Sequence, residues 1–201
     1  MPGAAFGIPT LMNAAMTSAP RPAADDVRVA QACAAGDAAT FEELYRRHGD
    51  RMKSIAYNHL GNISDAEDAV QETFLKIHRA ASTFNAESAF TTWAYRILIN
   101  SCYDLLRKRK RRGDEAPIDD YFESSRAALS VDDAKRITLR KLLNELPEQR
   151  RSVFVLFEIE GLSHAEIGEI LDISEGNSKW ILFATKKQLQ EKWRNEPPVM
   201  K

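Results

Sequence analysis

The sequence predicts an all-α protein with two small helical domains joined by an acidic, flexible linker. Apolar residues recur at spacings of three and four over long stretches, which is the period of an amphipathic helix. Nine glycines and eight prolines in 201 residues leave little material for turns. The helical pattern is interrupted over residues 113–132, where Gly113, Pro117 and many acidic residues stand together.

The same pattern divides the chain into segments. We expect a disordered tail over 1–22, a first helical domain over 23–112, the acidic linker over 113–132, a second helical domain over 133–195 and a C-terminal tail over 196–201. The N-terminal stretch has no charge before Arg21, and Gly7 and Pro9 interrupt its apolar residues, so it does not resemble a signal peptide. No stretch approaches the ~20 apolar residues of a membrane span. We therefore expect a soluble, cytoplasmic protein without membrane insertion.

Composition and motifs argue against an enzyme. Hydrophobic residues make up 44% and charged residues 28% of the chain, as in an ordinary globular protein, and the net charge is -1. Cys33 and Cys102 follow no C-x-x-C spacing and are predicted to be reduced, packed thiols. None of the four histidines has Glu three residues before it, and no H-E-x-x-H or G-x-S-x-G occurs. We predict no catalytic residue, no metal and no cofactor.

A capping box, Ser64-Asp65-Ala66-Glu67, predicts the start of a helix that runs to about Ala81. One face of this helix is expected to face the core: Ala66, Val70, Thr73, Phe74 and Ile77. The opposite face carries Asp68, Glu72, Leu75 and Arg79, with Gln71 at its border. Such a face is either a solvated surface or a docking surface with Leu75 as its apolar centre.

The longest predicted helix spans about 90–112 and ends in six consecutive basic residues, 107–112. Its predicted buried stripe is Phe90, Trp93, Ala94, Ile97, Leu98, Ser101, Cys102 and Leu105. Its predicted outer side is Thr92, Arg96, Asn100, Tyr103, Arg107 and Lys110. Six basic residues exceed what a helix dipole needs, so we expect this run to contact phosphates.

The second half predicts a helix-turn-helix. Pro147 ends one helix, and the next spans 148–160 and stops at Gly161. A second capping box, Ser163-His164-Ala165-Glu166, opens a third helix. The short turn Asp172-Ile173 leads to Ser174, an N-cap for a longer helix that would lie in the major groove of DNA.

Three separated motifs carry a resemblance to a known family. They are D-A-E-D-A-V-Q-E-T-F-L-K (65–76), F-N-A-E-S-A-F-T-T-W-A-Y-R-I-L-I-N (84–100) and L-P-E-Q-R-R-S-V-F-V-L-F-E-I-E-G-L-S-H-A-E-I-G-E-I-L (146–171). In this order and spacing they resemble the extracytoplasmic-function sigma factors, the small members of the bacterial sigma-70 family. The resemblance covers roughly residues 25–192.

The resemblance implies contacts with core RNA polymerase and with the −10 promoter element. It places Asp68, Gln71, Glu72 and Leu75 against the clamp helices of the largest polymerase subunit, and it implies a further contact with the flap of the second-largest subunit. The −10 contacts that it implies are Phe84, Asn85, Ser88, Arg96, Asn100, Tyr103, Arg107, Lys108 and Lys110. It also places the acidic linker in the nucleic-acid path of polymerase.

The predicted recognition helix departs from the family pattern, which is close to G-T-V-K-S-R-L-x-R-A-R-K. The −35 contacts that we expect are Ser174, Glu175, Gly176, Asn177, Lys179, Trp180, Phe183 and Lys187. Ile181 and Ala184, however, stand where the family has arginine. With Leu182 inward, Trp180 should point outward. Either the helix is rotated or buried, or Trp180 and Phe183 contact DNA, or they bind a protein partner.

The sequence thus predicts an alternative sigma factor that binds core RNA polymerase and directs promoter recognition, with promoter DNA and an anti-sigma factor as further partners. Two alternatives stay open. One is a helix-turn-helix regulator that acts without polymerase, and the other is a sigma-like interaction protein with weakened −35 recognition.

Overall fold

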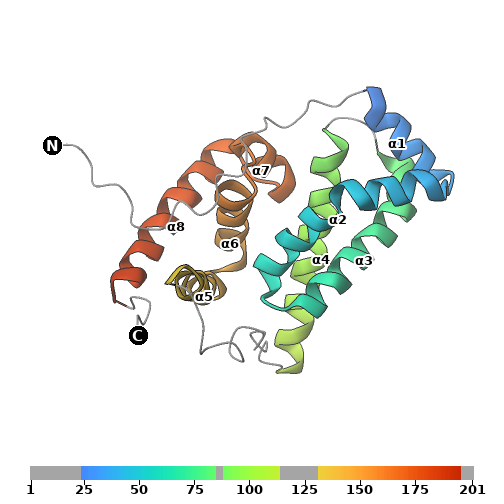
Figure 1. Cartoon of the computed structure of the whole chain (residues 1–201). Helices are drawn as coiled ribbons and strands as arrows, with labels where there is room; N and C mark the ends of the chain where they lie inside the picture. Colours follow the sequence, from blue (N-terminus) through green and yellow to red (C-terminus); the bar gives the residue numbers. More distant parts are fainter. Residues whose placement is uncertain (1–23, 85–87, 114–130, 196–201) are drawn as a thin grey trace.

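The computed structural model describes residues 24–84, 88–113 and 131–195. These residues form two helical domains, and they contain no β-strand. Figure 1 shows helices α1–α4 as one bundle and helices α5–α8 as a second bundle beside it. The all-α architecture with two domains is therefore confirmed. The linker predicted over 113–132 lies almost entirely outside the described residues, as do both predicted tails.

The first domain consists of α1 (Ala24–Ala34), α2 (Ala38–Leu60), α3 (Ile63–Ala80), the 3-10 turn η1 (Ala81–Thr83) and α4 (Phe90–Arg112). Helix α2 begins where the Thr40 backbone N–H donates to the Asp37 carboxylate at 3.2 Å. It ends at Gly61, whose φ of 70° is the left-handed conformation that glycine adopts without strain.

Helix α3 starts earlier than the sequence suggested. The residue that caps it is Asn62, whose side chain accepts a hydrogen bond of 3.0 Å from the Asp65 backbone N–H. The predicted cap at Ser64 is wrong, because Ser64 already lies inside the first helical turn. The predicted core face is confirmed, since Ala66, Val70, Thr73, Phe74 and Ile77 are all buried, together with Ala69.

Helix α4 is buried on more of its circumference than one stripe. Phe90, Ala94, Leu98, Ser101 and Cys102 are buried as predicted. Thr92, Tyr95 and Ile99 are buried as well, and of these Thr92 was expected on the outer side. The cause is the number of neighbours of this helix, because α4 packs against α2, α3 and α7.

The second domain contains α5 (Val131–Asn144), α6 (Glu148–Phe154), α7 (His164–Leu171) and α8 (Glu175–Asn195). A π-helical turn, η3 (Val155–Ile159), continues α6, so the expected single helix over 148–160 changes its winding halfway. Gly161 follows with a φ of 69°. The capping box at the start of α7 is confirmed: the Glu166 backbone N–H donates to Ser163 Oγ at 3.3 Å, and the Ser163 backbone N–H donates to the Glu166 carboxylate at 2.8 Å.

The turn between α7 and α8 requires a close backbone approach at Gly168. The Ile173 backbone N–H donates to the Gly168 carbonyl at 3.0 Å, and Asp172 adopts a positive φ of 55°. A Cβ atom on Gly168 would lie 2.7 Å from the carbonyl oxygen of Ile173. Because that distance is shorter than real Cβ contacts allow, the helix-turn-helix depends on glycine at this position.

The two domains are in contact through polar groups as well as apolar ones. Helix α4 packs against α7, and α2 packs against α5, α6 and η3. The buried Arg151 guanidinium donates to the carbonyls of Leu143 and Asn144 at the end of α5 and to that of His59 at the end of α2. One arginine thereby satisfies helix C-terminal carbonyls from both domains.

Both cysteines are buried and unpaired, as the sequence predicted. Burial raises the pKa of the Cys102 thiol to about 12, so this group is an inert core residue. Within the described ranges, no cluster of His, Cys, Asp and Glu could hold a metal ion. None of the helices in those ranges has the length and hydrophobicity that crossing a bilayer requires.

Candidate nucleic-acid interface

The outer face of α3 combines an exposed apolar residue with acidic neighbours. Leu75 is 51% exposed, although it is a large hydrophobic residue on a well-packed helix. Asp68, Gln71 and Glu72 are also exposed. All four residues of the predicted docking surface therefore lie together on the side of α3 that faces away from the core.

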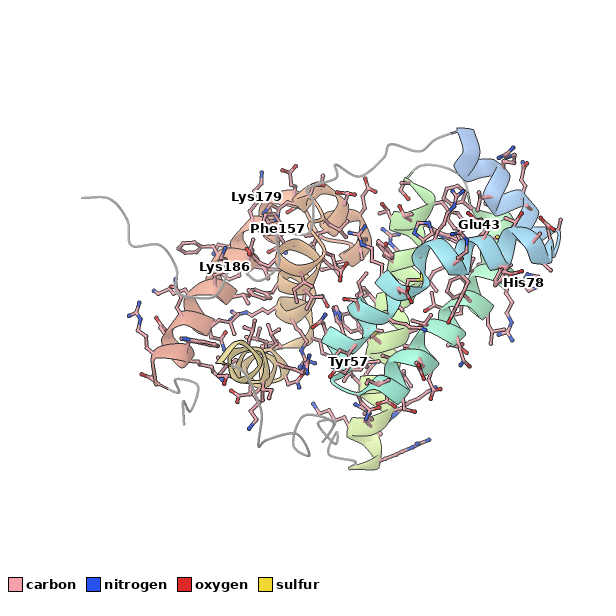
Figure 2. All side chains as sticks on the ribbon, viewed as in Figure 1. Glu43, Tyr57, His78, Phe157, Lys179 and Lys186 are labelled. Atoms are coloured by element: carbon pink, nitrogen blue, oxygen red, sulfur yellow. The ribbon has the colours of Figure 1, made fainter. Side chains whose placement is uncertain are left out.

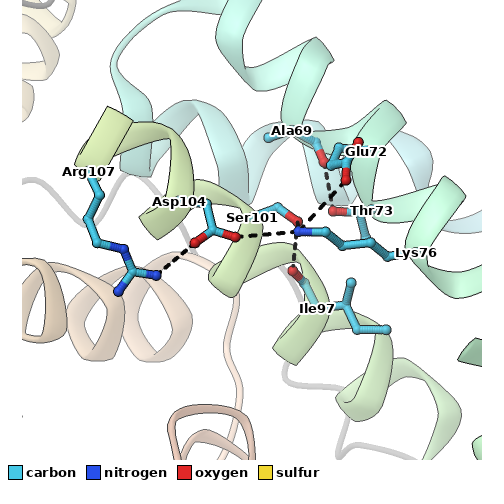
Figure 3. Close-up of polar contacts among 8 residues, drawn as sticks. All are labelled: Ala69, Glu72, Thr73, Lys76, Ile97, Ser101, Asp104 and Arg107. Atoms are coloured by element: carbon cyan, nitrogen blue, oxygen red, sulfur yellow. Dashed lines mark hydrogen bonds and ion pairs between the residues drawn. The ribbon is translucent and has the colours of Figure 1, made fainter. Parts of the chain in front are cut away.

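A polar bridge fixes α3 against α4 next to this face (Figure 3). The Lys76 ammonium lies 3.1 Å from Ser101 Oγ, 3.5 Å from the Asp104 carboxylate and 3.9 Å from the Glu72 carboxylate. Asp104 in turn accepts a hydrogen bond of 2.8 Å from Arg107, and this bond is the main reason why the pKa of Asp104 is lowered. The bridge connects the acidic face of α3 to the basic end of α4.

The basic residues at the end of α4 differ in availability. Arg109 donates to the Leu60 carbonyl at 3.2 Å and pairs with Asp65, so it joins α4 to the α2–α3 turn. Arg107 is exposed but pairs with Asp104. Lys108, Lys110, Arg111 and Arg112 are exposed. The run therefore offers an exposed basic helix end, with Arg109 as a structural member of it.

Aromatic rings gather where the chain enters α4. The ring centroid of Phe84 lies 5.5 Å from those of both Phe90 and Trp93, and the Phe90 and Trp93 centroids are 5.4 Å apart. Phe84 is half-buried in this cluster, and Ser88, four residues further along the chain, is half-buried too. Asn85, the third predicted contact of this segment, lies outside the described residues.

Three predicted −10 contacts follow along α4. Asn100 is exposed. Arg96 is exposed too, but its Nε donates to the carbonyl of Glu169 in α7 at 2.9 Å. The Tyr103 hydroxyl lies 2.6 Å from Ser152 Oγ in α6. The structure thus brings all three onto one helix, and it places two of them in contact with the second domain.

Helix α8 presents a mixed basic and aromatic surface. The Asn177 backbone N–H donates to Ser174 Oγ at 3.1 Å, which is the predicted N-cap. Lys179 pairs with Glu175 at 2.6 Å. Glu175, Gly176, Asn177, Lys179 and Lys187 are exposed. Figure 2 shows Lys179 and Lys186 along this helix, and Lys186 pairs with Glu158 at 2.7 Å.

The apolar stretch 180–183 of α8 is divided between core and surface. Trp180 is 61% and Phe183 is 71% exposed, whereas Ile181 is 4% and Leu182 is 7% exposed. The expected outward direction of Trp180 is therefore confirmed, and a rotated helix that buries it is ruled out. Ile181 fills a core position where the family pattern has arginine, so no guanidinium can reach outward from it.

Comparison with known proteins places these surfaces in a family. Residues 44–112 match the model of sigma-70 region 2, and residues 136–189 match that of sigma-70 region 4. The chain is 32% identical over 154 residues to the ECF RNA polymerase sigma factor SigM of Mycobacterium tuberculosis, a match that covers 77% of each chain. The chain belongs to the extracytoplasmic-function sigma factors of the sigma-70 family. As such it is an alternative sigma factor that directs transcription initiation.

Further relatives agree with this membership. The chain is 30% identical to the ECF RNA polymerase sigma-E factor of Salmonella typhimurium, over 78% of this chain and 88% of the relative. Among solved structures, the complex of CnrH with the cytosolic domain of CnrY matches with a TM-score of 0.66 at 23% identity, over 85% of this chain and 98% of that one. The sigma factor RpoE of Bartonella quintana, bound to the anti-sigma factor NepR, matches with a TM-score of 0.58 at 22% identity, over 75% of this chain and 94% of that one. Both show that the fold is shared.

Gly168 and Glu160 are the residues that sequence reasoning missed. Gly168 was visible as a glycine in the interior of a short predicted helix, which is a signal for close packing. Glu160 has no comparable signal, because its partners Arg51 and Ser54 are more than a hundred residues away in the sequence and belong to the other domain.

Proposed function

We propose that this sigma factor binds core RNA polymerase through the outer face of α3 and guides it to promoters through α4 and α8. The observation that carries the proposal is the exposure of Leu75 among Asp68, Gln71 and Glu72 on a helix whose other side is packed. An apolar centre with a charged rim is the usual composition of a protein–protein interface. The chain itself needs no cofactor, because polymerase supplies the catalysis, and it acts in the cytoplasm.

The −10 element would be bound at the entry and along the outer side of α4. Phe84 and Ser88 flank the segment that would hold an unstacked base, since aromatic rings stack on bases without regard to sequence. Arg96, Asn100 and Tyr103 would contact the strand on the same helix. Arg107, Lys108 and Lys110 would neutralise phosphates, which adds affinity that does not depend on sequence.

The −35 element would be read weakly. Ile181 is buried and Ala184 has no donor, so the guanine contacts that arginine makes are absent at both positions. Each bidentate contact of that kind is worth about 1–3 kcal/mol of discrimination. Asn177, Lys179 and Lys187 still offer exposed side-chain donors on α8. The capped helix start at Ser174 would face the DNA backbone.

The exposed pair Trp180 and Phe183 favours a second candidate role for α8, the binding of a regulatory protein. Large apolar side chains that stand together on a surface more often mark a partner site than a guanine-reading site. The partner that we propose is an anti-sigma factor, as in the solved complex of RpoE with NepR. A flap contact of polymerase would use the same domain.

A charge and shape reversal on α3 tests polymerase docking. Leu75→Asp with Glu72→Lys should weaken binding to core RNA polymerase by about tenfold or more, because it removes an apolar anchor and reverses its rim. Asp50→Asn changes the net charge by the same amount as the double variant, one unit toward positive, at an exposed position of α2 and serves as the matched control. Binding is measured by fluorescence anisotropy of the labelled full chain. Unchanged affinity in the double variant, with unchanged helicity, would place the docking surface elsewhere.

A further inference from the structure

A hydrogen bond joins the two helices of the helix-turn-helix at the end of α7 that is opposite to their turn. His164 is the first residue of α7, and its Nδ1 atom lies 2.9 Å from Oγ of Ser178, in the first turn of α8. The covalent turn 172–174 holds the other end of α7. Because α7 has eight residues, the two attachments lie at opposite ends of a helix about 12 Å long. Together they fix the angle between α7 and α8.

The Ser178 hydroxyl is buried and depends on this histidine. Ser178 is 0% exposed. Among the described residues, no group other than His164 forms a hydrogen bond with Ser178 Oγ. Ser178 stands where the family pattern has valine, so this chain places a polar group at a position that is otherwise apolar. A buried hydroxyl without a partner is unfavourable, and His164 is therefore the group that allows serine at this position.

The direction of the bond follows from the same burial. Among the described residues, the hydroxyl hydrogen of Ser178 has one acceptor within reach, the unprotonated Nδ1 of His164. The neutral ring therefore carries its proton on Nε2. In a protonated ring Nδ1 would be a donor, and the buried hydroxyl hydrogen would lose its acceptor. The contact that joins α7 to α8 is thus made by the neutral form of His164.

The surroundings of the ring also favour its neutral form. His164 is half-buried and stacks on the uncharged ring of Phe157 in η3, with the ring centroids 4.4 Å apart and 21° between the ring planes. Burial lowers the pKa of His164, and the Lys179 ammonium lowers it further, whereas the Glu175 carboxylate acts in the opposite direction. Both charged groups lie on α8 and pair with each other. On α7 itself, the Glu166 carboxylate is bonded to the helix cap.

The attached turn of α8 carries contacts that we assign to the −35 element. Asn177 precedes Ser178, Lys179 follows it, and both are exposed. An asparagine amide can bond adenine at two atoms, and such base-edge contacts require a set position of the helix in the groove. Phosphates are present whatever the sequence, so contacts with them carry affinity without preference. Loss of the bond between His164 and Ser178 should therefore affect sequence preference more than total affinity.

We propose that His164 is a positioning residue for −35 recognition: its neutral ring accepts the Ser178 hydroxyl and holds the first turn of α8 at the angle at which Asn177 faces base edges, so that acid lowers sequence preference without a matching loss of DNA affinity. This inference rests on the proposed role of α8 in reading the −35 element. It concerns the second domain alone and requires no movement of one domain relative to the other.

The ratio of two DNA affinities tests the proposal, because attraction to phosphates is common to both. The complex of core RNA polymerase with the full chain first selects a duplex at pH 7.5 from a pool that is randomised over the −35 segment. A second duplex has this segment shuffled. Sequence preference is the affinity for the selected duplex divided by that for the shuffled duplex, and it is measured by fluorescence anisotropy at pH 7.5 and at pH 5.5.

We expect the preference of the unmodified chain to fall at least about threefold between pH 7.5 and pH 5.5. Ser178→Ala removes the hydroxyl, so it should show the lower preference already at pH 7.5 and little further change in acid. His164→Asn should keep a high preference at both pH values, because its amide oxygen replaces Nδ1 as the acceptor and does not titrate. His78→Asn is the matched control, since it makes the same substitution at a histidine of α3 and should leave the pH dependence intact.

Nitrogen-15 NMR of the full chain reports the tautomer of His164 directly. At pH 7.5 the proton should lie on Nε2, and a proton on Nδ1 would overturn the inference. Equal preference in Ser178→Ala and the unmodified chain at pH 7.5 would overturn it too. If Ser178→Ala loses helicity by circular dichroism, the comparison of His164→Asn with the unmodified chain decides instead.

Two further results separate this inference from the proposed function of α8. A preference in the unmodified chain that is the same at both pH values, or one that falls in acid in His164→Asn as well, would show that His164 does not control DNA reading, although α8 does read the −35 element. If the unmodified chain does not distinguish the two duplexes at pH 7.5, the assignment of α8 to −35 DNA is itself wrong, and the inference fails with it.

Discussion

Acid should destabilise the folded protein through one histidine. His59 is fully buried, its Nδ1 lies 2.8 Å from the Ile55 carbonyl oxygen and its Nε2 lies 2.9 Å from Ser152 Oγ. A carbonyl can only accept, so in the neutral ring Nδ1 carries the proton and Nε2, which faces Ser152 Oγ, is unprotonated. Burial lowers the pKa of His59 from 6.5 to about 4, and the nearby Arg151 charge adds to this effect.

The sign and size of the effect follow from this pKa. The unfolded chain binds a proton at His59 below pH ~6.5, whereas the folded chain resists it until about pH 4. The stabilisation by the neutral ring is therefore complete above pH ~6.5 and is lost as the pH falls toward 4. Since one pKa unit corresponds to about 1.4 kcal/mol, the total loss is roughly 3 kcal/mol.

Urea unfolding of the full chain at pH 7.5 and at pH 4.5 measures this loss. Several carboxyl groups with lowered pKa, among them those of Asp37 and Asp104, also reduce stability in acid, so the test is a comparison with His59→Gln. The variant should lose about 2–3 kcal/mol less than the unmodified chain between the two pH values. His164→Gln is the control. Burial lowers the pKa of His164 as well, but that ring is less buried than His59. Equal losses in His59→Gln and the unmodified chain would refute a buried neutral imidazole.

Two further predictions concern the helix-turn-helix. Gly168→Ala should cost about 1–3 kcal/mol in unfolding free energy, because its Cβ would meet the Ile173 carbonyl at 2.7 Å. Gly176→Ala is the control for stability, since a Cβ at that position has open space around it. An unaffected thermal midpoint in Gly168→Ala would contradict the close approach. Leu182→Ala should cost about 2–5 kcal/mol in unfolding free energy as a core truncation. Trp180→Ala, by contrast, should change the unfolding free energy by about 1 kcal/mol or less. It should weaken binding of an anti-sigma factor at least as much as binding of −35 DNA. A large drop in the midpoint of Trp180→Ala, or a selective loss of DNA binding, would contradict the partner role of that side chain.

Helical phase was the most predictable property of this chain. Each residue advances a helix by about 100°, so the burial of Leu182 implied that Trp180 points away from the core. The same reasoning placed Asp68, Glu72 and Leu75 on the exposed side of α3. Caps were less certain, because two suitable residues stood near one helix start. Asn62 caps α3 in place of Ser64, since its side chain reaches the Asp65 N–H.

Contacts between the domains were not predictable from periodicity. Tyr103 and Thr92 were expected on the outer side of α4, but the first is half-buried against Ser152 and the second is buried. A helical pattern reports the apolar face toward the nearest core, and polar contacts such as Tyr103 with Ser152 leave no apolar signal. Arg109 shows the same limit within one domain, because its side chain returns to Asp65 and Leu60 instead of extending to solvent.

The π-helical turn of η3 gives the second domain a sensitivity to chain length. A π turn holds one residue more than the α-helical turn that it replaces, and here the Glu160 backbone N–H bonds to the Val155 carbonyl five residues earlier. Deletion of one residue within 155–159 would let α-helical winding continue and would rotate Glu160 by about 100° away from Arg51. If the deleted residue is one of the uncharged ones, the deletion removes no ionisable group. Homologues that differ by one residue at this point should therefore differ in how readily their domains separate, even where every charged residue of the interface is retained.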